Sequence, residues 1–191
     1  IPTLVITDGI TTQTITDETP GDGAFLTPGA VLFSGSIGSW VITVNNGTTK
    51  PLIGSASLPD MDLSFLAVSS GAGTLSITFS DDGFTASSGF VSKIGGTVGS
   101  GGSVSSALYL NGNAISNAGP FSPGAFSNTA YGNVTLGAND VLALGVVLTA
   151  NAGGVVSSGD YNVTVPDGGT TALLVGLGLV GMSVAARRKK A

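Results

Sequence analysis

Apolar and polar residues alternate with a period of two along much of the chain. Residues 74–80 show the alternation most clearly, and residues 39–45 repeat it. Successive side chains of a β-strand point to opposite faces, so this period predicts strands with one face in a core. The apolar positions of the two segments, which we expect to face the same core, are Trp40, Ile42, Val44, Leu75, Ile77 and Phe79.

Glycine-rich turn sequences separate segments of this kind. Asn46 and Gly47 form the preferred pair of a two-residue hairpin turn, which predicts a turn here and an edge strand over residues 48–55. Residues 71–73 predict a second hairpin, and residues 95–102 predict a loop.

Helical periodicity is missing from all of the chain before residue 170. Short β-branched segments follow one another at spacings of roughly 10–15 residues, as in all-β domains. We therefore expect an antiparallel β-sandwich of about ten short strands over residues 1–165, with a closed β-barrel as the alternative.

A different pattern begins after the expected sandwich, in residues 166–191. Residues 170–186 carry no charge, and as a helix they would be roughly 25 Å long, near the lower limit for a bilayer core of ~30 Å. We expect a single C-terminal hydrophobic α-helix here, anchored in a membrane. Its small residues, which would allow a neighbouring helix to approach closely, are Ala172, Gly176, Gly178, Gly181 and Ala185.

A short motif precedes this apolar stretch and a basic end follows it. The motif consists of Val165, Pro166, Asp167, Gly168 and Gly169, and the basic end of Arg187, Arg188, Lys189 and Lys190. Four of the six basic residues of the chain stand in that end, which the positive-inside rule places in the cytoplasm.

The order of motif, apolar stretch and basic end resembles the PEP-CTERM sorting signal of Gram-negative bacteria, in its Val-Pro-Asp variant. The resemblance implies that an exosortase, a membrane transpeptidase, cuts near the motif and passes the protein to the cell surface, often in organisms that secrete exopolysaccharide. An ordinary membrane anchor without processing is the alternative. The chain begins at Ile1 without a basic and apolar leader, and we expect that a signal peptide preceded it.

Composition excludes several classes of function. The chain has no Cys and no His, which excludes a Ser-His-Asp triad, a cysteine nucleophile and a conventional zinc site. Residues 1–169 hold all 11 acidic residues against Lys50 and Lys93, a net charge of −9 that argues against nucleic acid as a partner. A single Glu and few aromatic residues also disfavour a glycosidase, so we expect a protein that is not an enzyme.

Aspartates gather at turns, where carboxylate oxygens suit calcium. The candidate ligands are Asp60, Asp62, Asp81 and Asp82. Aspartates that only form turns are the alternative interpretation, and no other cofactor is expected.

Two functions fit these observations. The first is a non-enzymatic structural protein of the cell surface or of an extracellular biofilm matrix, which associates with itself into an oligomer or filament. The alternative is a module that binds carbohydrate or exopolysaccharide, with Trp40 and the tyrosines as the stacking surfaces. Exposure of Trp40 distinguishes the two, and a core position is the expected one for an alternating strand.

Overall fold

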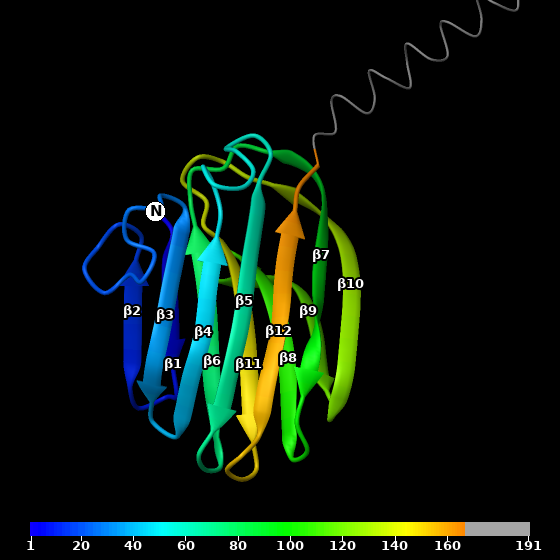
Figure 1. Cartoon of the computed structure of the whole chain (residues 1–191). Coiled ribbons are helices and arrows are strands. Elements are labelled where there is room, and N and C mark those ends of the chain that lie inside the picture. The colour runs from blue at the N-terminus through cyan, green and yellow to red at the C-terminus, as the bar shows by residue number, and fades with distance from the viewer. Residues whose placement is uncertain (167–191) are drawn as a thin grey trace, which may run out of the picture.

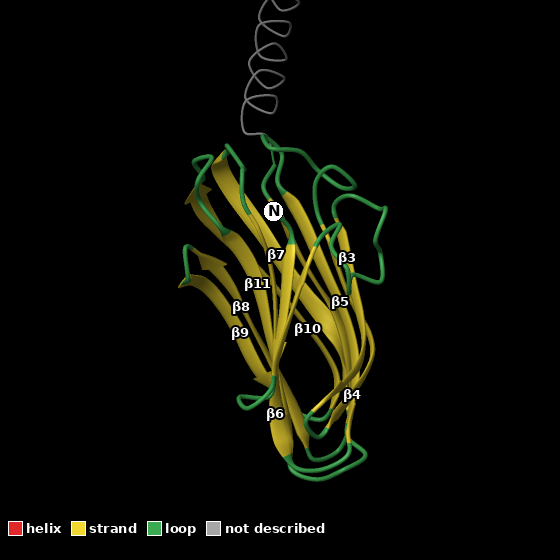
Figure 2. Ribbon diagram, turned by 90° about the vertical axis from the view of Figure 1, so that its left-hand side faces the viewer, coloured by secondary structure: helices red, strands yellow, loops and turns green. Residues whose placement is uncertain are grey.

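The computed structural model describes residues 1–166, which form two stacked antiparallel sheets of six strands each (Figures 1 and 2). Sheet A has the order β2-β1-β6-β11-β8-β9, and sheet B the order β10-β7-β12-β5-β4-β3. The first six strands are β1 (Thr3–Thr7), β2 (Thr12–Thr16), β3 (Ala30–Ile37), β4 (Trp40–Thr48), β5 (Asp60–Ser69) and β6 (Gly73–Asp81). The others are β7 (Ser87–Val98), β8 (Gly102–Leu110), β9 (Asn113–Phe121), β10 (Gly124–Thr135), β11 (Leu142–Ala150) and β12 (Val156–Thr164).

The prediction of about ten short strands followed by a helix is wrong for this part of the chain. Twelve strands are present and two of them are 12 residues long, while residues 1–166 contain no helix and therefore none that crosses a membrane. The alternation of apolar and polar residues did not predict strand β9, because β9 is an exposed edge strand with no buried residue. The helix expected over 170–186 lies outside the described residues.

The connections between strands are jelly-roll-like. From β5 to β8 the chain alternates between the sheets, and later β11 pairs between β6 and β8 while β12 pairs between β5 and β7. The hairpin predicted at residues 71–73 is therefore wrong, because β5 and β6 lie in opposite sheets. The two sheets share no paired strands, so the closed barrel is also wrong.

The core fills the space between the two sheets. Trp40, Ile42, Leu75, Ile77 and Phe79 are all buried in it, as the alternation predicted. The Val44 side chain is outside what the structure describes.

The turn predicted at Asn46 and Gly47 is wrong, because β4 continues through both residues to Thr48. A bulge between Ile42 and Val44 shifts the register of β4 against β5, and Asn45 is buried beyond it. A Cβ added at Gly47 would clash with the ring of Phe79, so this glycine is required for packing between the sheets rather than for a turn.

Candidate functional site

The outer face of sheet A is hollowed into a groove of about 340 Å³ across strands β6, β8, β9 and β11. Its floor is made of small residues: Ala107 of β8 stands opposite Gly145 of β11 in the strand pairing. The side chains that reach beyond this floor are Ser76, Thr78, Ser105, Tyr109, Asn117 and Val147. We call this hollow the sheet A groove.

Tyr109 forms the aromatic wall of the sheet A groove. Its ring lies against Gly145, where an added Cβ would be 2.6 Å from the ring atom Cε2. Glycine leaves room for the ring at this position, and the half-buried Tyr109 side chain packs against the Gly145 backbone.

The opposite walls of the groove are polar but uncharged. Ser76 and Thr78 come from β6, and Asn117 from β9, where it pairs with Ala107. The pairing of β8 with β9 has two irregularities, between Val104 and Ser106 and between Leu108 and Tyr109. Such irregularities increase the local twist of a strand, which explains how β9 bends into a wall.

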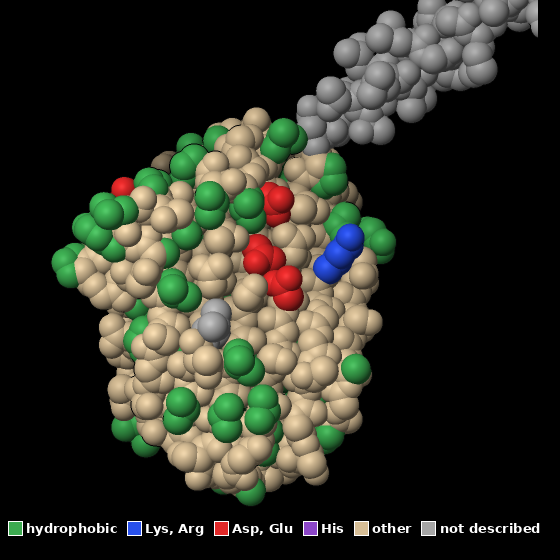
Figure 3. Space-filling view, viewed as in Figure 1, with side chains coloured by type: hydrophobic (Ala, Val, Ile, Leu, Met, Phe, Trp, Pro, Cys, Tyr) green, Lys and Arg blue, Asp and Glu red, His purple; other side chains and the backbone are tan. Residues whose placement is uncertain are grey.

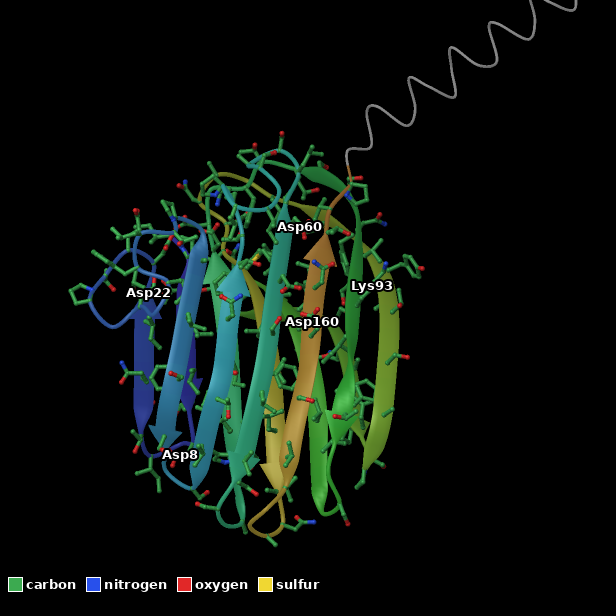
Figure 4. All side chains as sticks on the ribbon, viewed as in Figure 1. Asp8, Asp22, Asp60, Lys93 and Asp160 are labelled. Carbon is green, nitrogen blue, oxygen red and sulfur yellow. The ribbon has the colours of Figure 1, made fainter. Side chains whose placement is uncertain are left out.

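The outer face of sheet B carries an acidic patch instead (Figure 3). The Ser64 hydroxyl donates towards Asp62 Oδ2 at 3.4 Å and Asp160 Oδ1 at 3.3 Å, and Asn162 Nδ2 donates to Asp60 Oδ1 at 2.9 Å. In Figure 4, Asp60 and Asp160 lie on adjacent strands and Lys93 on the next strand. We call the group Asp60, Asp62 and Asp160 the sheet B acidic patch.

Burial raises the pKa of Asp62 to about 7, and the neighbouring Asp160 carboxyl adds to this effect. One proton is thus held on the sheet B acidic patch up to neutral pH. A hollow of about 480 Å³ adjoins the patch, lined by Lys93, Asp160, Asn162 and the polar side chains of β10.

The four candidate calcium ligands lie in two separate places. Asp60 and Asp62 belong to the sheet B acidic patch, whereas Asp81 is buried in an ion pair with Lys50, 2.5 Å from Nζ to Oδ2. The backbone oxygen of Asp82 accepts a further hydrogen bond from Lys50. Within residues 1–166, no three carboxylates are arranged to hold a metal ion, so calcium stays a prediction without a preformed ligand set.

The aromatic residues first considered as stacking surfaces differ in exposure. Trp40 is 0% exposed and Tyr161 only 2%, so neither is available to a ligand. Tyr131 is 77% exposed, but it lies on β10 of sheet B, outside the sheet A groove. Among these four residues, only Tyr109 is both partly accessible and part of the lining of the sheet A groove.

Of the sorting motif, the structure describes Val165 and Pro166. Val165 is buried and donates its N–H to the Pro59 carbonyl oxygen at 2.9 Å, which ties the end of sheet B to the loop before β5. The rest of the motif, the small residues of the apolar stretch and the basic end lie outside the described residues.

Comparison with known proteins gives only a distant likeness of fold. No family model matches, and no curated protein matches. The solved structure of TmCBM61 in complex with beta-1,4-galactotriose is 7% identical with a TM-score of 0.41, over 66% of this chain and 88% of the other. A family 35 carbohydrate binding module from Clostridium thermocellum is 12% identical with a TM-score of 0.36, over 71% and 87%.

A viral structure shows a similarly distant likeness. The structure of the infectious bursal disease virus Gx strain is 14% identical with a TM-score of 0.34, over 87% of this chain and 51% of that chain. Likeness at this level does not tell what the present chain binds, and only its own groove bears on that question.

Proposed function

We propose that residues 1–166 form a non-catalytic carbohydrate-binding domain, which holds an uncharged polysaccharide in the sheet A groove. The observation that carries this proposal is the ring of Tyr109, which packs against Gly145 over a floor of small residues and is faced by hydroxyl and amide groups.

Each part of the groove suits a sugar ring. A pyranose has an apolar face of C–H groups, which packs on an aromatic ring, and a rim of hydroxyls that both donate and accept hydrogen bonds. Ser76, Thr78 and Asn117 offer donors and acceptors of the same kind. Shallow grooves of this type release bound water from both surfaces when a ring enters.

The absence of charge in the groove lining selects for neutral sugars. None of the residues that line the groove is Asp, Glu, Lys or Arg. A uronate or sulfate group would lose hydration there without meeting a cation, which is unfavourable by several kcal/mol in a buried setting and about 1–3 kcal/mol at a partly exposed one.

Binding to a panel of soluble neutral polysaccharides tests the proposal, by calorimetry or by retardation in affinity gels. Tyr109→Ala should weaken binding about tenfold or more, which corresponds to ~1.4 kcal/mol of lost contact. Tyr131→Ala is the matched control, because it removes an exposed tyrosine from the other sheet. Equal effects of the two substitutions, or no binding to any neutral polysaccharide, would refute the proposal.

We also propose, from the order of the sequence signal alone, that the domain acts outside the cytoplasm and is anchored through residues 170–186 before exosortase cleavage. Mass spectrometry of the protein recovered from the cell surface tests this. Peptides that contain Arg187 to Lys190 in the surface material would contradict cleavage. The prediction that the protein associates with itself into a filament also depends on residues 170–186, and it stays a prediction.

A further inference from the structure

Four large exposed apolar side chains lie in two loops at the end of the sandwich from which the chain continues to residue 167; Figure 1 shows these loops at the upper left and at the top. Loop 17–29 contributes Phe25 and Leu26, which are 51% and 80% exposed, and loop 49–59 contributes Leu52 and Leu58, 50% and 44% exposed. We call these four residues the exit-end patch. Single exposed apolar residues are common and need no explanation, whereas four large ones in two neighbouring loops do.

Backbone hydrogen bonds link the two loops to each other, and the second loop to the point where the chain leaves. Thr49 donates its N–H to the Gly29 carbonyl oxygen at 2.8 Å, which joins the loops to each other. Val165 donates to Pro59 at 2.9 Å, which joins the second loop to the end of β12. The two loops and the end of β12 are therefore connected through the backbone.

The backbone at Leu26 is strained. Its φ is 85°, in the left-handed region that side chains other than those of Gly, Asn and Asp rarely adopt. No packing inside the domain offsets this strain, because the side chain is 80% exposed. A strained residue that presents a leucine to the outside indicates contact with something beyond the domain.

The sequence beyond the exit end limits where that contact lies. Three residues, 167–169, separate Pro166 from the uncharged stretch 170–186. Even fully extended, the chain from residue 166 to residue 170 reaches no more than roughly 14 Å. Whatever surface takes up residues 170–186 must therefore lie within that distance of Pro166, at the end of the sandwich that carries the exit-end patch.

We propose that the exit-end patch docks on a lipid bilayer, the one into which residues 170–186 insert. This inference relies on the proposed anchoring and not on the sheet A groove. Phe25 and Leu26 would enter the acyl boundary, where apolar loop residues gain from burial. The sheet A groove lies along the side of the sandwich and would stay open to solvent while the domain is docked.

The charge of the same end indicates the kind of lipid surface. Glu18 is exposed there, Asp81 is paired with Lys50, and the N-terminal ammonium of Ile1 lies 2.5 Å from Asp82 Oδ1. Lys50 and the N-terminal ammonium are both engaged with carboxylates and Glu18 would repel an anionic headgroup, so we expect docking on zwitterionic lipid without help from anionic lipid.

The absence of cysteine from the chain allows a direct test with the full-length protein in phosphatidylcholine vesicles. Leu26→Cys places an environment-sensitive fluorophore in the patch, and Ile10→Cys places it on an equally apolar side chain, 94% exposed, in the turn after Asp8 at the opposite end (Figure 4). The label at position 26 should be quenched by nitroxide-bearing lipids and shielded from iodide, and the label at position 10 should show the reverse.

A second measurement uses the combined substitutions Phe25→Ser and Leu26→Ser. The fluorophore is then carried at Leu58→Cys, 44% exposed in the same patch. We expect its quenching by lipid to fall about tenfold relative to the same label without the two serine substitutions, while Ile10→Ser leaves it unchanged. Vesicle-bound protein whose label at position 26 stays open to iodide would overturn the proposal, and so would a chain that does not bind vesicles. Shielding that depends on protein concentration and not on lipid would show a second copy as the occupant instead. Glycan binding by the sheet A groove should be the same in all these variants.

Discussion

At the scale of single residues, the sheet B acidic patch shows how strand pairing creates a titrating group. Asp62 and Asp160 are 98 positions apart in the sequence, and the pairing of β5 with β12 brings both to the Ser64 hydroxyl. Burial and the adjacent carboxyl disfavour the charged form of Asp62, which explains the rise of its pKa to about 7.

The raised pKa predicts a stability profile. An unfolded Asp ionises near pH 4, whereas Asp62 in the folded domain keeps its proton to about pH 7. The unfolded state therefore binds fewer protons between these values, and the stability of the domain should fall as pH rises from about 4 to about 7 and level off above that. Asp62→Asn cannot ionise, so it should flatten this slope and gain ~1 kcal/mol at pH 8, after allowance for solvent screening.

Urea unfolding at several pH values measures this effect. Asp8→Asn serves as the control, because backbone N–H groups of Thr11 and Ile10 lower the pKa of Asp8 and it is fully charged throughout this range. It should leave the slope between pH 5 and pH 7 unchanged. A parent protein whose stability is constant or rises over that range contradicts the assignment.

The sequence could predict which strand residues face the core, but it could not predict the sheet B acidic patch. Trp40 and Ile77 alternate with polar neighbours, and this local pattern suffices to place them in the core. Asp62 was interpreted as a calcium ligand near a turn, since its partner Asp160 is adjacent only once the strand order is known. The same holds for Tyr109, whose place in a groove depends on Gly145, 36 positions further along the chain.

At the scale of elements, glycines within the strands make room for aromatic rings. A Cβ at Gly132 would lie 2.5 Å from the Phe90 ring, and one at Gly159 would lie 2.7 Å from Phe65. Each of these glycines stands directly opposite its ring in the strand pairing. The rings cover backbone that would otherwise lack side-chain packing, which offsets the low strand preference of glycine.

This use of glycine explains which turns the sequence predicted wrongly. Residues 95–102 were expected to form a loop, but β7 continues through them to Val98. A Cβ added at Gly96 would lie 3.0 Å from Cζ of the Phe126 ring. Gly47 likewise leaves room for an aromatic ring, that of Phe79. Glycine and asparagine are turn signals only where no aromatic side chain from another strand needs their space, and that information is not local.

Gly47→Ala tests the packing role. The new methyl would overlap the buried Phe79 ring, so we expect a loss of ~1–3 kcal/mol in the free energy of unfolding. At a hairpin turn with positive φ, the same substitution would instead act through backbone strain. Gly95→Ala is the matched control within a strand, because its nearest neighbour would be the Phe126 carbonyl oxygen at an ordinary 3.6 Å. Denaturant midpoints give both values. Equal midpoints for the two variants would rule out a packing function for Gly47.

At the scale of the whole molecule, the order of strands in the chain decides when the sandwich can form. The centre of sheet A is completed by β11 and the centre of sheet B by β12, the last two strands of the chain. Each one pairs on both sides with strands made much earlier. Folds dominated by such distant pairings fold slowly, typically in milliseconds to seconds.

The domain should therefore not fold until almost all of it is present. A chain that ends at Gly154 lacks β12 and with it the buried side chains of Tyr161, Val163 and Val165, and it leaves β5 and β7 without their shared partner. We expect this chain to be unfolded by circular dichroism and rapidly digested by protease, whereas a chain that ends at Pro166 gives a protease-resistant sandwich with a single unfolding transition. The sheet A groove provides an independent check. All four of its strands precede residue 154, so any glycan binding by the shorter chain would show that sheet A forms without sheet B, and that the two sheets are not one cooperative unit.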